Sequence, residues 1–541
     1  MNVNKIAIGI IFMLIAYLPA NLTYKTNFSN GRILYVGGDG EGNYTNIQDA
    51  INDANDGDTI FVYDDSSPYC ENLVINKSIQ LIGENKNVTI IGKDSEENVL
   101  SIFANNVVIR NFTIKGSYMP KAGIYISGSI GNKISNCVLK DNGIGILIEE
   151  ATKINIVKCD IFDNLEGIYI EVSSENKICS CIVHDNYEGI SIYGNSEYVF
   201  NNSIENCSIY SNDDYGIEIY MACKIKLTNS SIFYNRYGLR MYCSFNNSIF
   251  NCKFINNGIH IGGDNIHHYI HKIENVTING KPFLYFVNEE GKMIEGEIGG
   301  ILMVNCSNFY IKNLKIEKTD VGIEISYGRE NIIENCKIYG CNDCGILIIN
   351  SSHNEIIDCE IKSEDGQGLK MLYSSKNNIS NNKFIKNNVC VIELVYSDEN
   401  LITNNTLNGK YNPQFGICIE SSKRNFIAYN NITGFWDIGI VIASYLSIDK
   451  NIIYKNTFYR NGISGIWIAD SIFNIIEKNN FIDQPVHASF ENAWNVWLRN
   501  YWDGWRTPLP KPIYGYIESF SGIRLFPLIN FDWLPSPKPW R

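Results

Sequence analysis

Proline and charge are both scarce in this chain of 541 residues, which holds 13 Pro and in which charged residues make up 19%. The low charge, together with 45% hydrophobic residues, excludes intrinsic disorder, because the chain has ample apolar surface to offset the entropy lost on folding. The 45 basic residues are outnumbered by 58 acidic ones, and no basic run occurs. We therefore expect no nucleic acid among the partners.

Long hydrophobic runs are also missing, apart from one near the N-terminus. Ile6 to Leu18 are almost all apolar, preceded by Lys5 and followed by Pro19-Ala20. The run is typical of a secretory signal peptide and short for a bilayer span. Residues 1–20 are therefore predicted to be an export signal or, if uncleaved, an N-terminal anchor, and only in that second case would the membrane be a partner. We expect the protein to be exported, either extracellular or at the cell surface.

What the sequence does contain is a repeat, which begins with Gly followed by apolar, any residue, apolar. Between these motifs lies a second alternating element, as in Asn132 to Leu139. Alternation over three to five residues that breaks at Gly, Asn or Ser predicts short strands and not helices. Within two blocks the motif recurs every 22 to 27 residues, with Val391 in place of Gly in one repeat. The glycines are Gly123, Gly145, Gly167, Gly189, Gly216 and Gly238 in the first block and Gly322, Gly345, Gly368, Gly416, Gly439 and Gly465 in the second.

Two or three short strands in each repeat predict an all-β fold, a single-stranded right-handed parallel β-helix in which every coil pairs with the next. A rise of ~4.8 Å for each coil predicts a single rod on the order of 70 Å long. The repeats span residues 123–484, with an irregular insertion at about 262–300 that we interpret as a projecting loop. We expect a monomer.

Both open ends of such a rod need caps, because unpaired strand edges invite aggregation. Residues 31–122 are predicted to hold the N-terminal cap and first coils, with Thr45-Asn-Ile-Gln48 as a capping box that opens a helix over Ile47 to Ala54. Residues 485–541 hold six of the eight Trp and eight of the 13 Pro. This composition predicts an irregular C-terminal lid, with an aromatic carbohydrate-binding platform as the alternative.

One column of the repeat is filled by Cys and then by Asn at the spacing of the coils. Such a column predicts a buried ladder at a turn, with Cys as a small apolar filler and stacked Asn amides bonded along the axis. Most of the 16 Cys are therefore expected to be free thiols, although neighbours ~4.8 Å apart could be bridged. The column comprises Cys137, Cys159, Cys181, Cys207, Cys336, Cys359, Asn382, Asn405, Asn430 and Asn456.

Several segments match a known family. They are Ile33-Leu-Tyr-Val-Gly-Gly, Ile47-Gln-Asp-Ala-Ile, Gly57-Asp-Thr-Ile, Asn279-Gly-Lys-Pro and Ile301-Leu-Met-Val-Asn-Cys, together with the Gly-Ile-x-Ile coils. From residue 33 to 533 the chain resembles NosD-type right-handed β-helix proteins of the pectin-lyase-like group, which is abundant in archaea. The resemblance implies the fold and a carbohydrate-associated surface protein. It also implies a copper-accessory role as one alternative.

Candidate chemistry for cleavage or metal binding lies in two places. Asp141, Asp163 and Asp185 recur at one phase, 22 residues apart, and Asp213-Asp214 is expected to continue the column one coil on. A stack of carboxylates could bind calcium or, through Asp185, Asp213 and Asp214, cleave a polysaccharide. A copper or zinc site could use only His267, His268 and His271. No cofactor is predicted, and calcium stays open.

Carbohydrate binding is the third possibility, because a strip of Tyr and carboxylates faces outward along adjacent coils. Flat rings suit sugar faces and acids accept sugar hydroxyls. The candidates are Tyr169, Glu171, Tyr193, Glu218, Tyr220 and Tyr242. Our leading interpretation is a non-catalytic surface protein with a structural or polysaccharide-binding face. The alternatives are a polysaccharide lyase, hydrolase or epimerase and a copper or zinc accessory protein.

Overall fold

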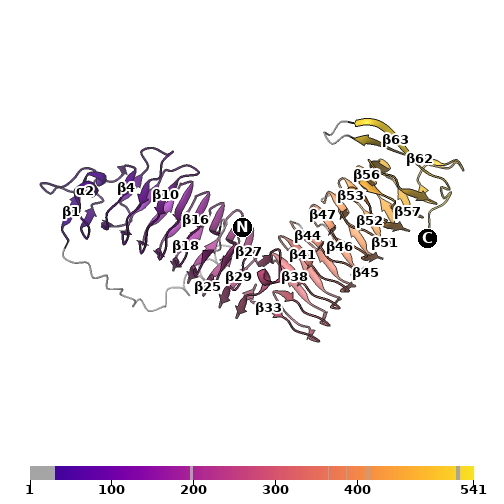
Figure 1. Ribbon diagram of the computed structural model, residues 1–541, viewed down its shortest axis with the longest axis horizontal. Coiled ribbons are helices and arrows are strands. Elements are labelled where there is room, and N and C mark those ends of the chain that lie inside the picture. Colours follow the sequence, from indigo (N-terminus) through magenta and orange to yellow (C-terminus); the bar gives the residue numbers. More distant parts are fainter. Residues whose placement is uncertain (1–30, 195–198, 364, 386, 411–412, 519–523) are drawn as a thin grey trace, which may run out of the picture.

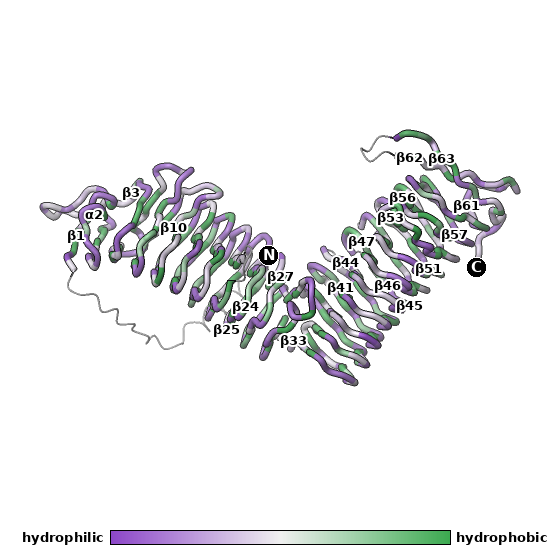
Figure 2. Tube along the Cα trace, viewed as in Figure 1, coloured by the Kyte–Doolittle hydropathy of each residue, from purple (hydrophilic) through white to green (hydrophobic). Residues whose placement is uncertain are grey.

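Short strands, most of them paired in parallel, make up nearly all of the regular secondary structure of the computed structural model, which describes residues 31–194, 199–363, 365–385, 387–410, 413–518 and 524–541. Figure 1 shows two β-helical rods joined at an angle. We define the first rod as residues 33–278 and the second rod as residues 281–532. Apolar segments recur in every coil between polar turns (Figure 2), as the repeat predicts.

Each rod has one sheet of longer strands, and in both rods this sheet lies on the inside of the bend (Figure 1). The side of these two sheets that points away from the core faces the inside of the bend, and we call it the inner face. In the first rod the sheet comprises β4 (Leu73–Ile75), β7 (Leu100–Ile102), β10 (Ala122–Ser127), β13 (Ile144–Glu149), β16 (Glu166–Glu171), β19 (Glu188–Tyr193), β23 (Tyr215–Tyr220), β27 (Tyr237–Tyr242) and β30 (Ile259–Gly262).

The corresponding sheet of the second rod runs from the joint to the C-terminal end. Its strands are β33 (Lys281–Val287), β35 (Gly300–Val304), β38 (Val321–Ser326), β41 (Cys344–Ile349), β44 (Gln367–Leu372), β47 (Cys390–Val395), β50 (Phe415–Glu420), β53 (Ile438–Ile448), β56 (Ser464–Ile472), β59 (Val486–Glu491) and β62 (Lys511–Glu518).

Two further parallel sheets complete the coils of each rod. In the first rod they run from β1 (Ile33–Val36) to β31 (Lys272–Glu274) and from β3 (Tyr69–Cys70) to β32 (Thr277–Ile278). In the second rod they run from β34 (Met293–Ile294) to β63 (Arg524–Asp532) and from β37 (Lys315–Glu317) to β61 (Tyr501–Trp502). The coil glycine is needed because coils approach closely: a Cβ on Gly145 would lie 2.5 Å from the carbonyl oxygen of Gly167.

The Cys and Asn column forms the buried ladder that the repeat predicts. Cys137, Cys159 and Cys181 are at most 1% exposed and are all free thiols. Where Asn takes over, the backbone N–H and Nδ2 of Asn382 both donate to Oδ1 of Asn405, at 2.9 and 3.0 Å. Asn405 makes the same pair of bonds to Asn430, and the ladder continues in this direction to Asn500.

The N-terminal helix is present, but its cap differs from the prediction. Helix α2 (Ile47–Asp53) begins after Asn46, and no side-chain bond of a capping box forms. Instead, the Glu71 carboxylate accepts the backbone N–H groups of Ile47 and Gln48 at 2.8 and 2.9 Å. A carboxylate from the next coil therefore satisfies the helix N-terminus, a contact that local sequence spacing cannot reveal.

The segment 262–300, which we interpreted as a projecting loop, forms strands that end one rod and begin the next. Strand β32 pairs antiparallel with β33, which reverses the parallel course and starts the second rod. The first rod then ends against the side of the second, where the outward side chains of Val321, Leu347 and Ile349 join the first rod's core. The prediction of one continuous rod is therefore wrong, because the sequence period does not show that the axis turns.

The coils also extend further toward the C-terminus than the Trp and Pro content predicts. Strands β59, β60 (Val496–Leu498) and β61 pair in parallel with the preceding coil. Trp502 is 1% exposed and stacks on Phe481, with ring centroids 4.4 Å apart, so it fills a core position and does not end the coils. Beyond it, β62 and β63 form an antiparallel hairpin.

Within the described residues, no helix is long and apolar enough to cross a bilayer. The predicted export segment, residues 1–20, lies outside the part of the chain that the structure describes.

Candidate functional site

The inner face of the first rod presents three outward columns of side chains, because alternate residues of each strand point away from the core. In β16, Ile168 and Ile170 are buried whereas Tyr169 and Glu171 are partly exposed. Parallel pairing places Tyr169 beside Ser191 and Glu171 beside Tyr193. The tyrosine–carboxylate strip, as we call this surface, comprises Glu166, Tyr169, Glu171, Glu188, Tyr193, Tyr215, Glu218, Tyr220, Tyr237, Arg240 and Tyr242.

The four predicted glycan-binding tyrosines form a continuous ladder on this strip. The ring centroids of Tyr169 and Tyr193 lie 5.5 Å apart, those of Tyr193 and Tyr220 lie 5.6 Å apart, and those of Tyr220 and Tyr242 lie 6.1 Å apart. Each ring is partly exposed. The structure therefore brings the predicted tyrosines together as one aromatic surface that crosses four coils.

Glu218 lies at the centre of the strip and is only 7% exposed. It accepts the Tyr193 hydroxyl and a bond from Nη1 of Arg240 at 3.2 Å. Arg240 also donates to the Tyr215 hydroxyl oxygen at 2.7 Å and lies over the rings of Tyr215 and Tyr242. Because the buried carboxylate has both a cation and a hydroxyl partner, this part of the strip is preorganised.

Two further carboxyls in the strip, those of Glu166 and Glu188, have raised pKa values. Burial, reinforced by the neighbouring carboxylates Glu188 and Glu171, raises the pKa of Glu166 to about 7. Burial also raises the pKa of Glu188, even though the Ser191 hydroxyl donates to this carboxyl at 3.1 Å. Oε2 of Glu166 is buried and has no hydrogen-bond partner among the described residues. At neutral pH this carboxyl can both donate and accept hydrogen bonds.

The strip continues into the joint between the rods. Nδ1 of His260 lies 2.7 Å from Oδ2 of Asp343 in the second rod, and Lys370 pairs with Glu393 at 2.9 Å. Burial raises the pKa of Glu324, which is 2% exposed, to about 7. The contact of His260 with Asp343 depends on how one rod docks on the other, so sequence reasoning could not predict it, whereas Lys370 and Glu393 are paired by the coil register of the second rod.

The predicted aspartates do not form one column. Asp141, Asp163 and Asp185 stack through backbone bonds of 3.1 Å and are exposed. The next place in the column is taken by Ser211, whose N–H bonds to Phe233 just as the Asp185 N–H bonds to Tyr210. Asp213 and Asp214 lie further along the chain, before β23. Asp214 faces Arg236 with 3.7 Å between charged atoms, and burial raises its pKa.

Two of the three predicted histidine ligands, His268 and His271, make hydrogen bonds within the protein through their rings, whereas His267 is exposed. Asn265 caps the short 3-10 helix η1 (Ile266–Tyr269), which carries His267 and His268. His271 is 9% exposed, its Nδ1 accepts the Asn247 N–H at 3.3 Å, and its Nε2 lies 3.0 Å from the His268 carbonyl oxygen. Across the described chain, no group of three or more His, Cys, Asp or Glu side chains converges in a way that could hold a metal ion.

Comparison with known proteins agrees with this architecture. A family model described as a right handed beta helix region matches residues 33–204, 198–280, 258–407, 299–442 and 408–500. A cell surface glycoprotein of Methanothermus fervidus is 35% identical over 98 residues, which are 18% of this chain and 16% of that protein. The match thus spans about one-sixth of the relative's length.

Solved structures with similar coils share little sequence with the chain. A pectate lyase, Pel9A, is 14% identical over 54% of this chain and 79% of its own, with a TM-score of 0.35. The A-module of mannuronan C-5 epimerase AlgE4 from Azotobacter vinelandii is 15% identical over 60% and 92%, with a TM-score of 0.35. The catalytic domain of a GH87 alpha-1,3-glucanase is 13% identical over 67% and 71%, with a TM-score of 0.37.

Proposed function

Because the chain belongs to the right-handed β-helix family, we propose that it is an exported cell-surface protein whose tyrosine–carboxylate strip binds polysaccharide without cleaving it. The observation that carries the proposal is the ladder of Tyr169, Tyr193, Tyr220 and Tyr242, one ring on each of four successive coils. Likeness to a cell surface glycoprotein supports the location.

The chemistry of the strip selects the kind of sugar. Phenol rings offer apolar surface and hydroxyls, and carboxylates accept sugar hydroxyls. The carboxyl groups of Glu166, Glu171, Glu188 and Glu218 face a single cation of the strip, Arg240, so the strip becomes more negative as pH rises through the pKa of Glu166, about 7. The strip therefore favours neutral or amino sugars and disfavours uronate chains, whose charge it repels.

Affinity electrophoresis of the full chain through neutral, amino and uronate polysaccharides tests this proposal. We expect retention by a neutral or amino polysaccharide, weakened about tenfold in Tyr193→Ala and in Tyr220→Ala, which corresponds to about 1.4 kcal/mol. Tyr429→Ala is the matched control, because Tyr429 is 48% exposed and packs on Tyr454, away from the strip. If all three variants are retained as strongly as the wild type, the strip is excluded as the polysaccharide-binding site.

Cleavage is the second candidate, and the raised pKa of Glu166, about 7, is the observation that favours it. A carboxyl that is half protonated near neutral pH can act as a general acid. The same polysaccharides, incubated with and without calcium, are assayed for new reducing ends and unsaturated products. Cleavage that disappears in Glu166→Gln, or in Asp185→Asn or Asp213→Asn, would replace the binding proposal with an enzymatic one.

A further inference from the structure

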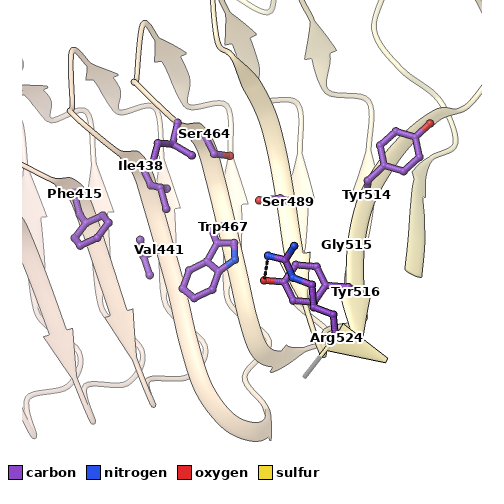
Figure 3. Close-up of a pocket in the computed structure, with 11 residues that line it drawn as sticks. Phe415, Ile438, Val441, Ser464, Trp467, Ser489, Tyr514, Gly515, Tyr516 and Arg524 are labelled. Atoms are coloured by element: carbon purple, nitrogen blue, oxygen red, sulfur yellow. Dashed lines mark hydrogen bonds between the residues drawn. The ribbon is translucent and has the colours of Figure 1, made fainter. Parts of the chain in front are cut away.

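A groove of about 510 Å³ opens on the inner face of the second rod, far from the strip. Figure 3 shows Trp467 at its centre, with Phe415, Ile438 and Val441 on one side and Tyr514 and Tyr516 on the other. The two tyrosines belong to β62, the last strand of the sheet, and Arg524 of β63 reaches over the same end. The volume falls within the range of roughly 300–1,000 Å³ that small-molecule sites occupy.

The register explains why this part of the inner face is apolar. Parallel pairing aligns Cys418 with Val441, Val441 with Trp467 and Trp467 with Ser489. This column corresponds to the one that carries Tyr169, Ser191, Glu218 and Arg240 in the first rod. A disulfide joins Cys390 to Cys418 of β50, the strand that carries Phe415, and so links one end of the groove to the preceding coil.

Most of the hydrogen-bonding side chains of the groove, those of Ser489, Tyr514, Tyr516 and Arg524, lie on one side of Trp467, and the other side is mainly apolar (Figure 3). The Ser464 hydroxyl already donates to the Ile466 carbonyl oxygen at 2.9 Å. A polyhydroxylated sugar on Ile438, Val441 and Ile463 would lose hydrogen bonds to water without replacement. The floor therefore suits a hydrocarbon chain, whose burial is favourable in proportion to its apolar area.

One positive charge lines the groove. The Arg524 guanidinium lies 4.0 Å from the centroid of the Tyr516 ring, and its Nη2 donates to the Tyr516 hydroxyl oxygen at 3.2 Å. Tyr516 in turn donates to the Glu491 carboxylate at 2.9 Å. These contacts hold the guanidinium at the rim, where it can pair with an anionic group in bidentate fashion.

We propose that this groove binds a single-chain amphiphile with an anionic head group, as a dissolved monomer. The hydrocarbon chain lies on Ile438, Val441 and Trp467, and the carboxylate or phosphate head pairs with Arg524. Apolar floor, volume and charge all point to this class. The site is separate from the tyrosine–carboxylate strip and does not rest on the function proposed for that surface.

Titration of the full chain with dodecyl phosphate below its micelle concentration, followed by calorimetry, tests the proposal. We expect saturable binding of one molecule for each chain, weakened at least tenfold in Trp467→Ala. Arg524→Gln should weaken the binding of dodecyl phosphate to a similar degree. The affinity for a neutral amphiphile with the same hydrocarbon chain should stay nearly unchanged. Arg524 is exposed and Trp467 half-buried, so both variants should fold, which circular dichroism and thermal unfolding verify.

Tyr193→Ala, in the strip, is the matched control and should bind dodecyl phosphate like the wild type. Trp467→Ala should keep any polysaccharide retention, so the two proposals can fail separately. The proposal is overturned if dodecyl phosphate does not bind saturably, or if neither variant changes its affinity. Binding to anionic phospholipid vesicles without binding of the monomer would also overturn it, because the ligand would then be a membrane surface.

Discussion

The two rods build the same coil with different side chains at equivalent places. In the first rod the turn column is filled by thiols, such as Cys137 and Cys159, that pack without strong hydrogen bonds. In the second rod the same column begins with the thiols of Cys336 and Cys359 and then changes to Asn side chains, which satisfy buried backbone groups of neighbouring coils. The fold thus needs a small side chain at this turn, and either apolar packing or hydrogen bonding can supply the stability.

The inner faces differ just as clearly. The first rod carries phenols and carboxylates there, whereas the second carries aliphatic side chains and an indole, with the change occurring beyond Lys370 and Glu393. Both surfaces rest on the same buried Ile columns, such as Ile168 and Ile440. Outward positions can therefore change chemistry without altering the scaffold, as expected when function is carried by sites on a common fold.

The largest expected effect on stability comes from the buried carboxyl groups at the joint between the rods. Burial raises the pKa of Asp320 and of Glu324 to about 7, although Asp320 accepts the Gly238 N–H of the other rod at 2.7 Å. Both carboxyls bind protons more tightly in the folded state than in the unfolded state. Stability should therefore fall as pH rises from 5 to 7, by about 1.4 kcal/mol per unit for each group.

His260 contributes with the same sign. Burial lowers the pKa of this imidazole, but Asp343 more than offsets that and raises it, so its contribution is full at low pH and lost as pH rises. Asp343 opposes the trend only in acid, because its pKa is lowered. Burial raises this pKa, but the charge and hydrogen bond of His260, together with the charges of Lys370 and Arg240, outweigh burial. Thermal unfolding at pH 5 to 8 measures the slope. It should flatten in Asp320→Asn and in Glu324→Gln, and an unchanged slope in both would contradict the assignment.

The next largest effect distinguishes the two ladders. Asn405 donates to the Ile379 carbonyl oxygen at 2.9 Å and accepts two bonds from Asn382, so Asn405→Ala leaves several buried groups without partners. At about 1–3 kcal/mol for each group, we expect a loss of about 4 kcal/mol. Cys159→Ala should cost only about 1 kcal/mol, because it removes one small buried atom. Denaturant unfolding compares them, and equal losses would show that both columns act by packing alone.

The smallest effect concerns thiol chemistry. Fourteen cysteines are free and Cys390 is bonded to Cys418. Burial raises the pKa of Cys252 to about 11 and that of Cys341 to about 12, so these thiols stay protonated and react slowly in the folded protein. Titration of the denatured, unreduced chain should find fourteen thiols, whereas the native chain should react mainly at exposed Cys70. A count near zero after denaturation would disprove the free ladder.

The repeat makes the coil predictable from sequence, because parallel stacking returns each side chain to the same place. The Gly column, the Cys and Asn ladder and the tyrosine ladder all follow from that period. Glu166 and Glu188 were equally visible, each directly before a coil glycine and 22 residues apart. Their place on the strip follows from the period, but the partial burial that raises the pKa of both depends on the packing of neighbouring side chains, which the period does not show.

The bend could not be predicted in the same way. Leu347 and Ile349 stand at outward positions of a coil and are buried only because another rod docks on them, so the period gives no sign of their partner. Composition was misleading at the C-terminus, where Trp502 continues a core column that includes Phe458 and Phe481. The local spacing of residues predicts features that recur in every coil. The joint depends instead on contacts such as that of Gly238 with Asp320, which are 82 positions apart in the sequence.

The Asn ladder has a direction, and this direction gives the molecule a defined end. The backbone N–H of each Asn, from Asn382 to Asn479, donates to the Oδ1 of the Asn in the next coil. The last Asn of the series therefore needs an acceptor of another kind. At Asn500 that acceptor is Asp532, which takes both the backbone N–H and Nδ2 through Oδ2, as well as Nε1 of Trp502 at 3.0 Å. A carboxylate has no N–H to offer onward. Asp532 therefore ends the series of hydrogen bonds, so the ladder itself fixes the coil at which the second rod stops.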